Sequence, residues 1–445
     1  RKMNKLKSKK GITLVALVVT IVVLLILAGV SINLVLGNNG IIAKAQEAKT
    51  KQAEASENDL KGMNSLIEQM ESTLNEGSSD NKEDDELGKL VNDMGTLPED
   101  TTPYFPSSDF KRREKTNTEN GLVIEDTEGN EYVWVVVPRT TAVYATTGLG
   151  KTTFTDADYT SIENDLKEYT KTYRGSTSYS DVYYADDKNV GWFADATAYN
   201  NLKNSMLKSV YENGGFYVGR YEAGIGTNRT SKSATNSDGK YTIEGMPAPV
   251  SKADAYPYTY VTRTQAQNLA SNVNSGTKTS SLMFGVQCDL VLAFMSKDTA
   301  KITSTSILTS NSTTIGNYMD STFQLSQTGK YATMSNWTLS STWNPTTTAT
   351  TNFVDSSRNK IAKSSPGNGI LVTTGTSEKN KVMNIYDVAG NVWEWTLENT
   401  SAPSSPCALS GGFCSITGSD YPAANRVFNS TDASNLGVGF RVSLF

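Results

Sequence analysis

The chain of 445 residues contains no histidine and only three cysteines. Without histidine there can be no Ser-His or Cys-His nucleophile pair, no imidazole acid-base catalysis and no histidine zinc ligand, which excludes most classes of hydrolase. Three cysteines in so long a chain do not make a disulfide scaffold. A bridge between Cys407 and Cys414 is one alternative, and three unpaired, small apolar side chains are the other.

The chain also lacks a basic face that would bind nucleic acid. Its 41 Lys and Arg residues are outnumbered by 46 Asp and Glu residues, for a formal net charge of −5. We therefore expect no nucleic-acid partner. Hydrophobic residues make up 37% and charged residues 20%, as in soluble globular proteins, and the length predicts one large folded unit with appendages.

Residues 1–10 are rich in lysine and precede a long apolar run at residues 12–36. Such a run can span a bilayer, which needs about 20 apolar residues in a helix. The preceding lysines predict a cytoplasmic N-terminus, with the chain beyond residue 36 outside the cell. A secretory signal peptide would have a shorter apolar core and a cleavage site at its far end.

The step from Lys10 through Gly11 to Ile12 resembles the processing site of a type IV prepilin, in which a peptidase cuts after the glycine. The resemblance implies that Gly11 is the processing site, that prepilin peptidase is a partner, and that other pilin subunits are partners in a filament. Ala16 stands where that family usually has a glutamate that pairs with a neighbouring subunit. A plain membrane anchor is the alternative.

Composition divides the chain into four parts. Residues 1–11 form a basic leader, and residues 12–75 are predicted to form an apolar membrane helix that continues into an exposed stalk helix. Residues 76–109 form an acidic linker that contains prolines. Residues 110–445 form the folded domain, with short strands, many turns and long loops rich in Ser, Thr and Asn.

Several elements of this domain can be predicted locally. Residues 122–124 and 132–137 form a hairpin around a turn at 128–130, and residues 215–221 form another strand. A helix is expected from a cap at Thr264 through residue 270, and a second at residues 288–295. Residues 299–353 are polar and irregular, which predicts a surface loop.

The most specific pattern lies at residues 384–395, and it contains two carboxylates around a tight Ala-Gly turn. This turn at residues 389–390 would let Asp387 and Glu394 converge with the carbonyl groups between them. Two carboxylates with carbonyl oxygens suit Ca²⁺. The alternative is that the carboxylates cap turns while Trp393 and Trp395 fill the core.

Together with residues 216–222, 282–289 and 438–442, this pattern resembles the formylglycine-generating enzyme or sulfatase-modifying-factor family. The resemblance implies a fold similar to C-type lectins, whose first and last strands pair, here residues 132–137 and 439–444. It also implies structural calcium, held by the side chains of Asp387 and Glu394 and the carbonyls of Gly390 and Val392. The predicted fold class is therefore α+β: an N-terminal transmembrane, pilin-like helix followed by a C-type lectin-like domain with short strands and long loops.

Members of that enzyme family use two cysteines and copper, shortly after a Gly-Gly step. Counting from Gly411 places Ile416 and Tyr421 at those two positions, and Cys414 is displaced from the first by two residues. Without a second thiol or a histidine, a soft metal has no ligand set. We therefore predict no enzyme activity and no copper.

Residues 410–435 mix apolar and polar side chains without strand or helix periodicity. The segment resembles the variable region of proteins diversified by retroelements, which share the lectin-like scaffold. The resemblance implies that residues 410–437 are a variable, ligand-binding segment. The implied framework is Gly411, Gly412, Gly418, Pro422, Asn425, Arg426, Gly439, Phe440 and Arg441. The implied ligand-facing residues are Phe413, Cys414, Ser415, Ile416, Thr417, Asp420, Tyr421, Val427, Phe428 and Asn429.

The sequence thus predicts a pilin-like adhesin or receptor on a bacterial cell surface, either membrane-anchored or in a type IV pilus, with its C-terminal domain outside. Its ligand would be a protein or glycan on another cell or a phage. Exposed aromatic side chains beside polar ones suit such a binding surface. Two alternatives are a membrane-tethered formylglycine-generating oxidase that uses Cys414, with or without Cys407, and a structural minor pilin that caps a filament.

Overall fold

The computed structural model describes residues 101–445, except residues 114, 176–177, 186–192, 232–234, 327, 336–337, 341, 347–359 and 363–368. The predicted leader, the processing site at Gly11, the apolar and stalk helices, and the linker up to residue 100 lie outside the described residues. The described residues belong to one compact unit.

The predicted fold class is wrong for the part of the chain that the structure describes. This part contains five α-helices and is otherwise mostly strands and loops. None of its helices is both long enough and apolar enough to cross a membrane. The longest, α5 (Ala196–Asn213), carries Lys203, Lys208 and Glu212 among several asparagines, and one face packs in the core while the other is polar.

The first large sheet has six strands in the order β1-β2-β3-β5-β21-β8, all antiparallel. The strands are β1 (Lys111–Arg112), β2 (Val123–Glu125), β3 (Glu131–Val136), β5 (Gly215–Gly219), β8 (Ser280–Leu282) and β21 (Val442–Leu444). The predicted hairpin is confirmed as β2–β3. The predicted pairing of the first and last strands is wrong, because β5 lies between β3 and β21, with Val218 opposite both Val133 and Ser443.

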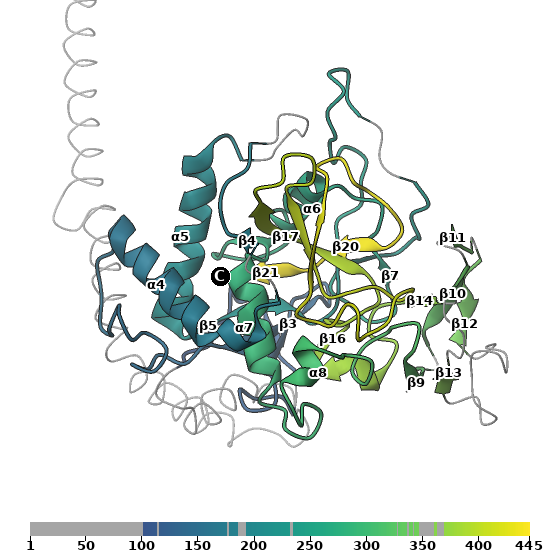
Figure 1. Ribbon diagram of the computed structural model, residues 1–445, viewed down its shortest axis with the longest axis horizontal. Coiled ribbons are helices and arrows are strands. Elements are labelled where there is room, and N and C mark those ends of the chain that lie inside the picture. Colours follow the sequence, from purple (N-terminus) through teal and green to yellow (C-terminus); the bar gives the residue numbers. More distant parts are fainter. Residues whose placement is uncertain are drawn as a thin grey trace, which may run out of the picture. The chain divides into compact units, whose positions relative to one another are not determined.

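The second large sheet carries the C-terminal part of the chain. Its strands are β4 (Tyr179–Ser180), β17 (Trp393–Thr400), β18 (Cys407–Ser410), β19 (Arg426–Asn429) and β20 (Val438–Phe440). The order is β19-β18-β17-β20, and β4 also pairs with β17. Only the pairing of β17 with β20 is parallel. Strand β17 contacts α6, which lies beside it in Figure 1.

Four helices besides α5 complete this part: α4 (Asp156–Tyr169), α6 (Arg263–Ala270), α7 (Gly285–Met295) and α8 (Ser306–Thr309). Helix α6 was predicted, but its cap is Thr262, which forms a capping box with Gln265. Helix α7 was predicted from residue 288, and it begins at Gly285. Every residue of α7 is buried, as expected for a helix that is apolar all round.

The prediction of a surface loop at residues 299–353 is wrong in part. The structure places β9 (Thr322–Gln324), β10 (Lys330–Ser335), β11 (Thr338–Leu339) and β12 (Asn344–Pro345) there. They pair with one another and with β13 (Lys360–Ala362) and β14 (Ile370–Val372), and gather at one side in Figure 1. A small separate core of Phe323, Tyr331, Ile370 and Val372 supports them. The described part also contains two small two-stranded sheets: β6 (Gly224–Ile225) with β7 (Tyr256–Pro257), and β15 (Lys381–Val382) with β16 (Ile385–Tyr386).

Candidate functional site

The turn that leads into β17 uses three residues with positive φ: Asp387 at 57°, Gly390 at 76° and Asn391 at 57°. Asn and Asp tolerate this region better than most residues, because their short side chains form local hydrogen bonds. Glycine is also required sterically at position 390, since a Cβ there would lie 2.3 Å from the carbonyl oxygen of Asn317. The predicted tight turn is therefore present, and another segment packs directly against it.

Asn391 ties this turn to three other segments. Its Oδ1 accepts hydrogen bonds from Nδ2 of Asn317 (2.9 Å) and from the backbone N of Val372 (3.1 Å). Its Nδ2 donates to Oε2 of Glu222 (2.7 Å). The side chain is fully buried, so each of these bonds holds a polar group that would be costly to leave unpaired. Residues 384–395 are thus linked by buried hydrogen bonds to three other segments of the fold.

The two carboxylates predicted to bind calcium have protein partners. Oε1 of Glu394 lies 2.9 Å from Nε and 2.6 Å from Nη2 of Arg441. Asp387 accepts from the backbone N of Gly375 (2.8 Å) and from Nδ2 of Asn380 (3.2 Å). Burial raises the pKa of Asp387 to about 6, against the opposing effect of these hydrogen bonds and of Arg441.

In this arrangement Glu394 has a cationic partner from the protein itself. The buried guanidinium of Arg441 supplies the positive charge beside Glu394, and it also donates to the carbonyl oxygens of Gly219 and Tyr386. In the described ranges, no three acidic, cysteine or histidine side chains cluster as metal ligands would. Calcium binding through Asp387, Glu394 and the carbonyls of Gly390 and Val392 therefore stays a prediction.

A closed ring of ion pairs anchors β19. Arg426, from β19, contacts Asp289 of α7 (2.6 Å) and Glu398 of β17 (2.9 Å). Arg174 contacts the other oxygens of the same two carboxylates, at 2.8 Å from Asp289 and closely at Glu398. Burial would raise the pKa of Glu398, but the two guanidinium groups outweigh burial and its pKa lies below the ordinary value. The ring joins β19 to α7 and β17.

Three of the residues predicted to face a ligand are buried. Phe413 is 1% exposed, Cys414 is fully buried and Ser415 is 8% exposed. The chain turns inward after Gly411 and Gly412, whose φ values of 96° and 89° favour glycine. These three assignments are therefore wrong, because side chains packed in the core cannot contact a ligand at the surface.

The other seven predicted residues are at least partly accessible: Ile416, Thr417, Asp420, Tyr421, Val427, Phe428 and Asn429. In the loop before β19, Oγ1 of Thr417 donates to Oδ2 of Asp420 (2.7 Å). The ring of Tyr421 rests edge-on against Trp393, with centroids 5.4 Å apart. The accessible side chains are thus supported by ordered neighbours.

On β19 itself, the exposure differs from residue to residue. Arg426 is buried in the ion-pair ring, Val427 and Asn429 are half-buried, and Phe428 is 62% exposed. Phe428 is one of three exposed large hydrophobic residues in the described part of the chain, with Leu149 and Val182. Arg426 and Phe428 are two residues apart on a regularly paired strand and lie on the same face, so the ion-pair ring and the exposed phenyl group together define the candidate binding strand.

None of the three cysteines forms a disulfide, and all three are buried. Cys407 and Cys414 therefore do not form a bridge. Burial raises the pKa of the Cys288 thiol well above its ordinary value. Ile416 and Tyr421, which the predicted resemblance places at the enzyme family's active-site cysteines, are half-buried.

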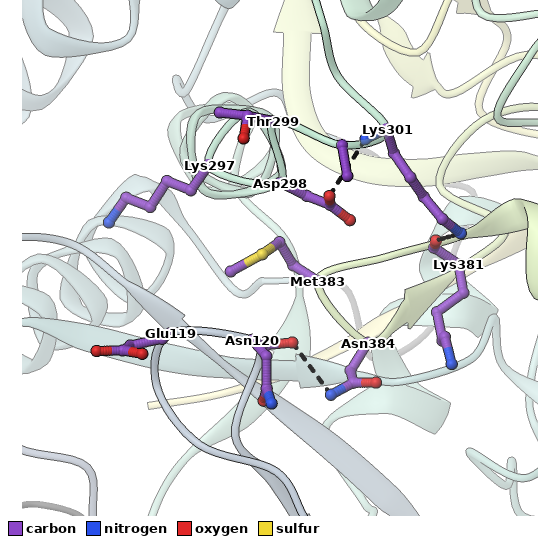
Figure 2. A pocket seen from close by; sticks show the side chains of 10 residues that line it. Glu119, Asn120, Lys297, Asp298, Thr299, Lys301, Lys381, Met383 and Asn384 are labelled. Carbon is purple, nitrogen blue, oxygen red and sulfur yellow. Dashed lines mark hydrogen bonds between the residues drawn. The ribbon is translucent and has the colours of Figure 1, made fainter.

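A separate pocket of about 360 Å³ opens between the end of α7 and the turn from β15 to β16. Its lysines do not converge: Lys297 and Lys381 point away from one another in Figure 2. Nζ of Lys301 donates to the carbonyl oxygens of Glu378 (2.7 Å) and Lys381. Sequence reasoning missed this pocket, because its walls come from three separate parts of the chain.

No protein-family model matches the chain, and no curated protein matches it. Among solved structures, the chain is similar to Treponema denticola variable protein 1, with 11% sequence identity. The alignment covers 78% of this chain and 99% of that one, with a TM-score of 0.21. A TM-score this low does not establish a shared fold. The resemblances to prepilins and to the formylglycine-generating enzyme family stay predictions.

Proposed function

We propose that the chain is a non-catalytic, ligand-binding protein that recognises a protein or glycan through the accessible residues of 416–429. This proposal rests on the difference in exposure between neighbouring residues of β19. Phe428 is 62% exposed, while Arg426, two residues away, is held in a buried ring of ion pairs. Because Arg426 and Phe428 lie on the same face of β19, the ring holds one end of the face that carries Phe428, which reduces the entropy lost on binding.

The burial of the cysteines supports a binding role over the oxidase alternative. Cys407 and Cys414 are both fully buried, so neither thiol reaches the surface to meet a substrate cysteine. A reactive cysteine usually sits in a partly exposed, electropositive environment that favours the thiolate. The location at a bacterial cell surface stays a prediction, because the residues on which it depends lie outside the described part.

Binding to arrays of bacterial and host glycans and surface proteins tests this proposal with the full, labelled chain. We expect binding to a subset of the array, and loss of most of that binding in the variant Asp420→Ala/Phe428→Ala. The matched control is Lys297→Ala/Lys381→Ala, which alters the separate pocket. Binding that survives the first variant and is lost in the second would move the site away from residues 416–429.

A further inference from the structure

Strand β19 lies at the edge of the second sheet. Its inner edge pairs with β18, with Ala408 opposite Phe428 and Ser410 opposite Arg426. In the described part of the chain, no backbone hydrogen bond joins β19 to a segment other than β18. Alternate residues of an edge strand direct their N–H and C=O groups away from the sheet, so β19 presents backbone donors and acceptors on its outer side.

This edge lacks the usual protection against strand addition. Proteins commonly protect an edge with charged side chains, proline or a very short strand. Strand β1, at the edge of the six-stranded sheet, follows this rule with only Lys111 and Arg112. Strand β19 is twice as long, and its only charged side chain, Arg426, is turned into the ion-pair ring. Its exposed residue is Phe428, an aromatic type that favours strands.

We propose that β19 receives an extended peptide segment of the ligand as an added strand. This inference rests on the proposed binding function and assigns a polypeptide ligand to it. Main-chain hydrogen bonds to the outer edge would provide affinity, and an apolar side chain of the peptide would cover Phe428. The matching segment is free of proline, carries little charge and has β-branched or aromatic residues at alternate positions.

A second copy of the chain suits this edge less well than a peptide. Two β19 strands paired with one another would contribute only four residues from each copy. Stable interfaces between folded proteins bury at least about 1,000 Å² in total, with about 20–30 residues from each partner. A short edge with one exposed aromatic side chain is closer in size to the peptide-binding edges of strand-addition domains.

Selection from a library of random linear decapeptides, with the full chain as the target, tests this proposal. We expect the selected peptides to be poor in proline and rich in β-formers. Their affinity should fall at least about tenfold on Phe428→Lys, which places a charge on the edge. Phe428→Thr, which keeps strand propensity, should weaken binding less. The matched control Leu149→Lys adds the same charge at another exposed hydrophobic residue, outside residues 416–429, and should leave affinity unchanged. Amide exchange of residues 426–429 should slow when peptide binds.

The other possible results would contradict either strand addition alone or the proposed function as well. Peptides or array ligands that lose affinity on Asp420→Lys but not on Phe428→Lys would overturn strand addition and leave the proposed function intact. Binding indifferent to both variants would overturn the two together. A concentration-dependent dimer that Phe428→Lys dissociates would show that a second copy occupies the edge, and would also overturn this inference. Because Phe428 is exposed, its variants should melt at the same temperature as the parent protein, which checks that they fold.

Discussion

Removal of Arg426 should destabilise the domain strongly, because it breaks the ion-pair ring that anchors β19. In Arg426→Met, Asp289 and Glu398 keep only Arg174, which is the most accessible member of the ring with 15% of its side chain exposed. Loss of one partner from a buried ion pair leaves an uncompensated charge and costs about 3–5 kcal/mol. Two hydrogen bonds, to the carbonyl oxygens of Ala424 (3.1 Å) and Gly285 (3.3 Å), are lost as well.

Urea titration of the full chain measures this change in the free energy of unfolding. The double variant Arg426→Met/Glu398→Gln removes one charge of each sign, and we expect it to be more stable than the sum of the two single variants predicts. Lys171→Met, which breaks an ion pair with Glu168 whose two side chains are 66% and 71% exposed, is the surface control and should change little. A loss below about 1 kcal/mol for Arg426→Met, or strict additivity in the double variant, would refute the role of the ring.

Three further perturbations test the buried polar groups of the domain. Burial raises the pKa of Asp181 to about 7. Between about pH 4 and pH 7 the folded state therefore keeps a proton that the unfolded chain has released. The contribution of protonated Asp181 to the free energy of unfolding is complete below about pH 4 and is lost by about pH 7. Asp181→Asn should remove that part of the pH dependence, which is on the order of 4 kcal/mol when the free energy of unfolding is measured by urea titration at several pH values. An unchanged slope of this free energy against pH would contradict the raised pKa of Asp181. Gly285→Ala should lower the free energy of unfolding by at least about 2 kcal/mol, because its Cβ would lie 1.9 Å from Cδ of Glu398. The control Gly226→Ala should be nearly neutral in the same unfolding assay, because no atom lies within 4 Å of the added Cβ. If Asp387 and Glu394 bind Ca²⁺, chelation of divalent cations should lower the melting midpoint and added Ca²⁺ should restore it; an unchanged midpoint would remove the calcium site and leave Arg441 as the source of the buried positive charge.

The hairpin β2–β3, strand β5 and helix α7 could be predicted because their signals are local. Alternating or continuous apolar residues, a turn with Gly129 and the absence of proline inside each element are enough to define them. The tight turn at Gly390 was predictable for the same reason. The position of β5 between β3 and β21 was not, since strand order depends on contacts between residues far apart in the chain.

Some features of the candidate site could also be predicted from the sequence, and others could not. The mixture of aromatic and polar residues in 410–437 marked the segment from the sequence alone, and the lack of histidine excluded much of enzyme chemistry. The sequence could not reveal that Phe413 is buried while Phe428 is exposed, because two phenylalanines differ only in the surroundings that the fold gives them. Nor could it pair Arg174 with Glu398, since the energy of a buried charge depends on neighbours that only the tertiary structure brings within reach.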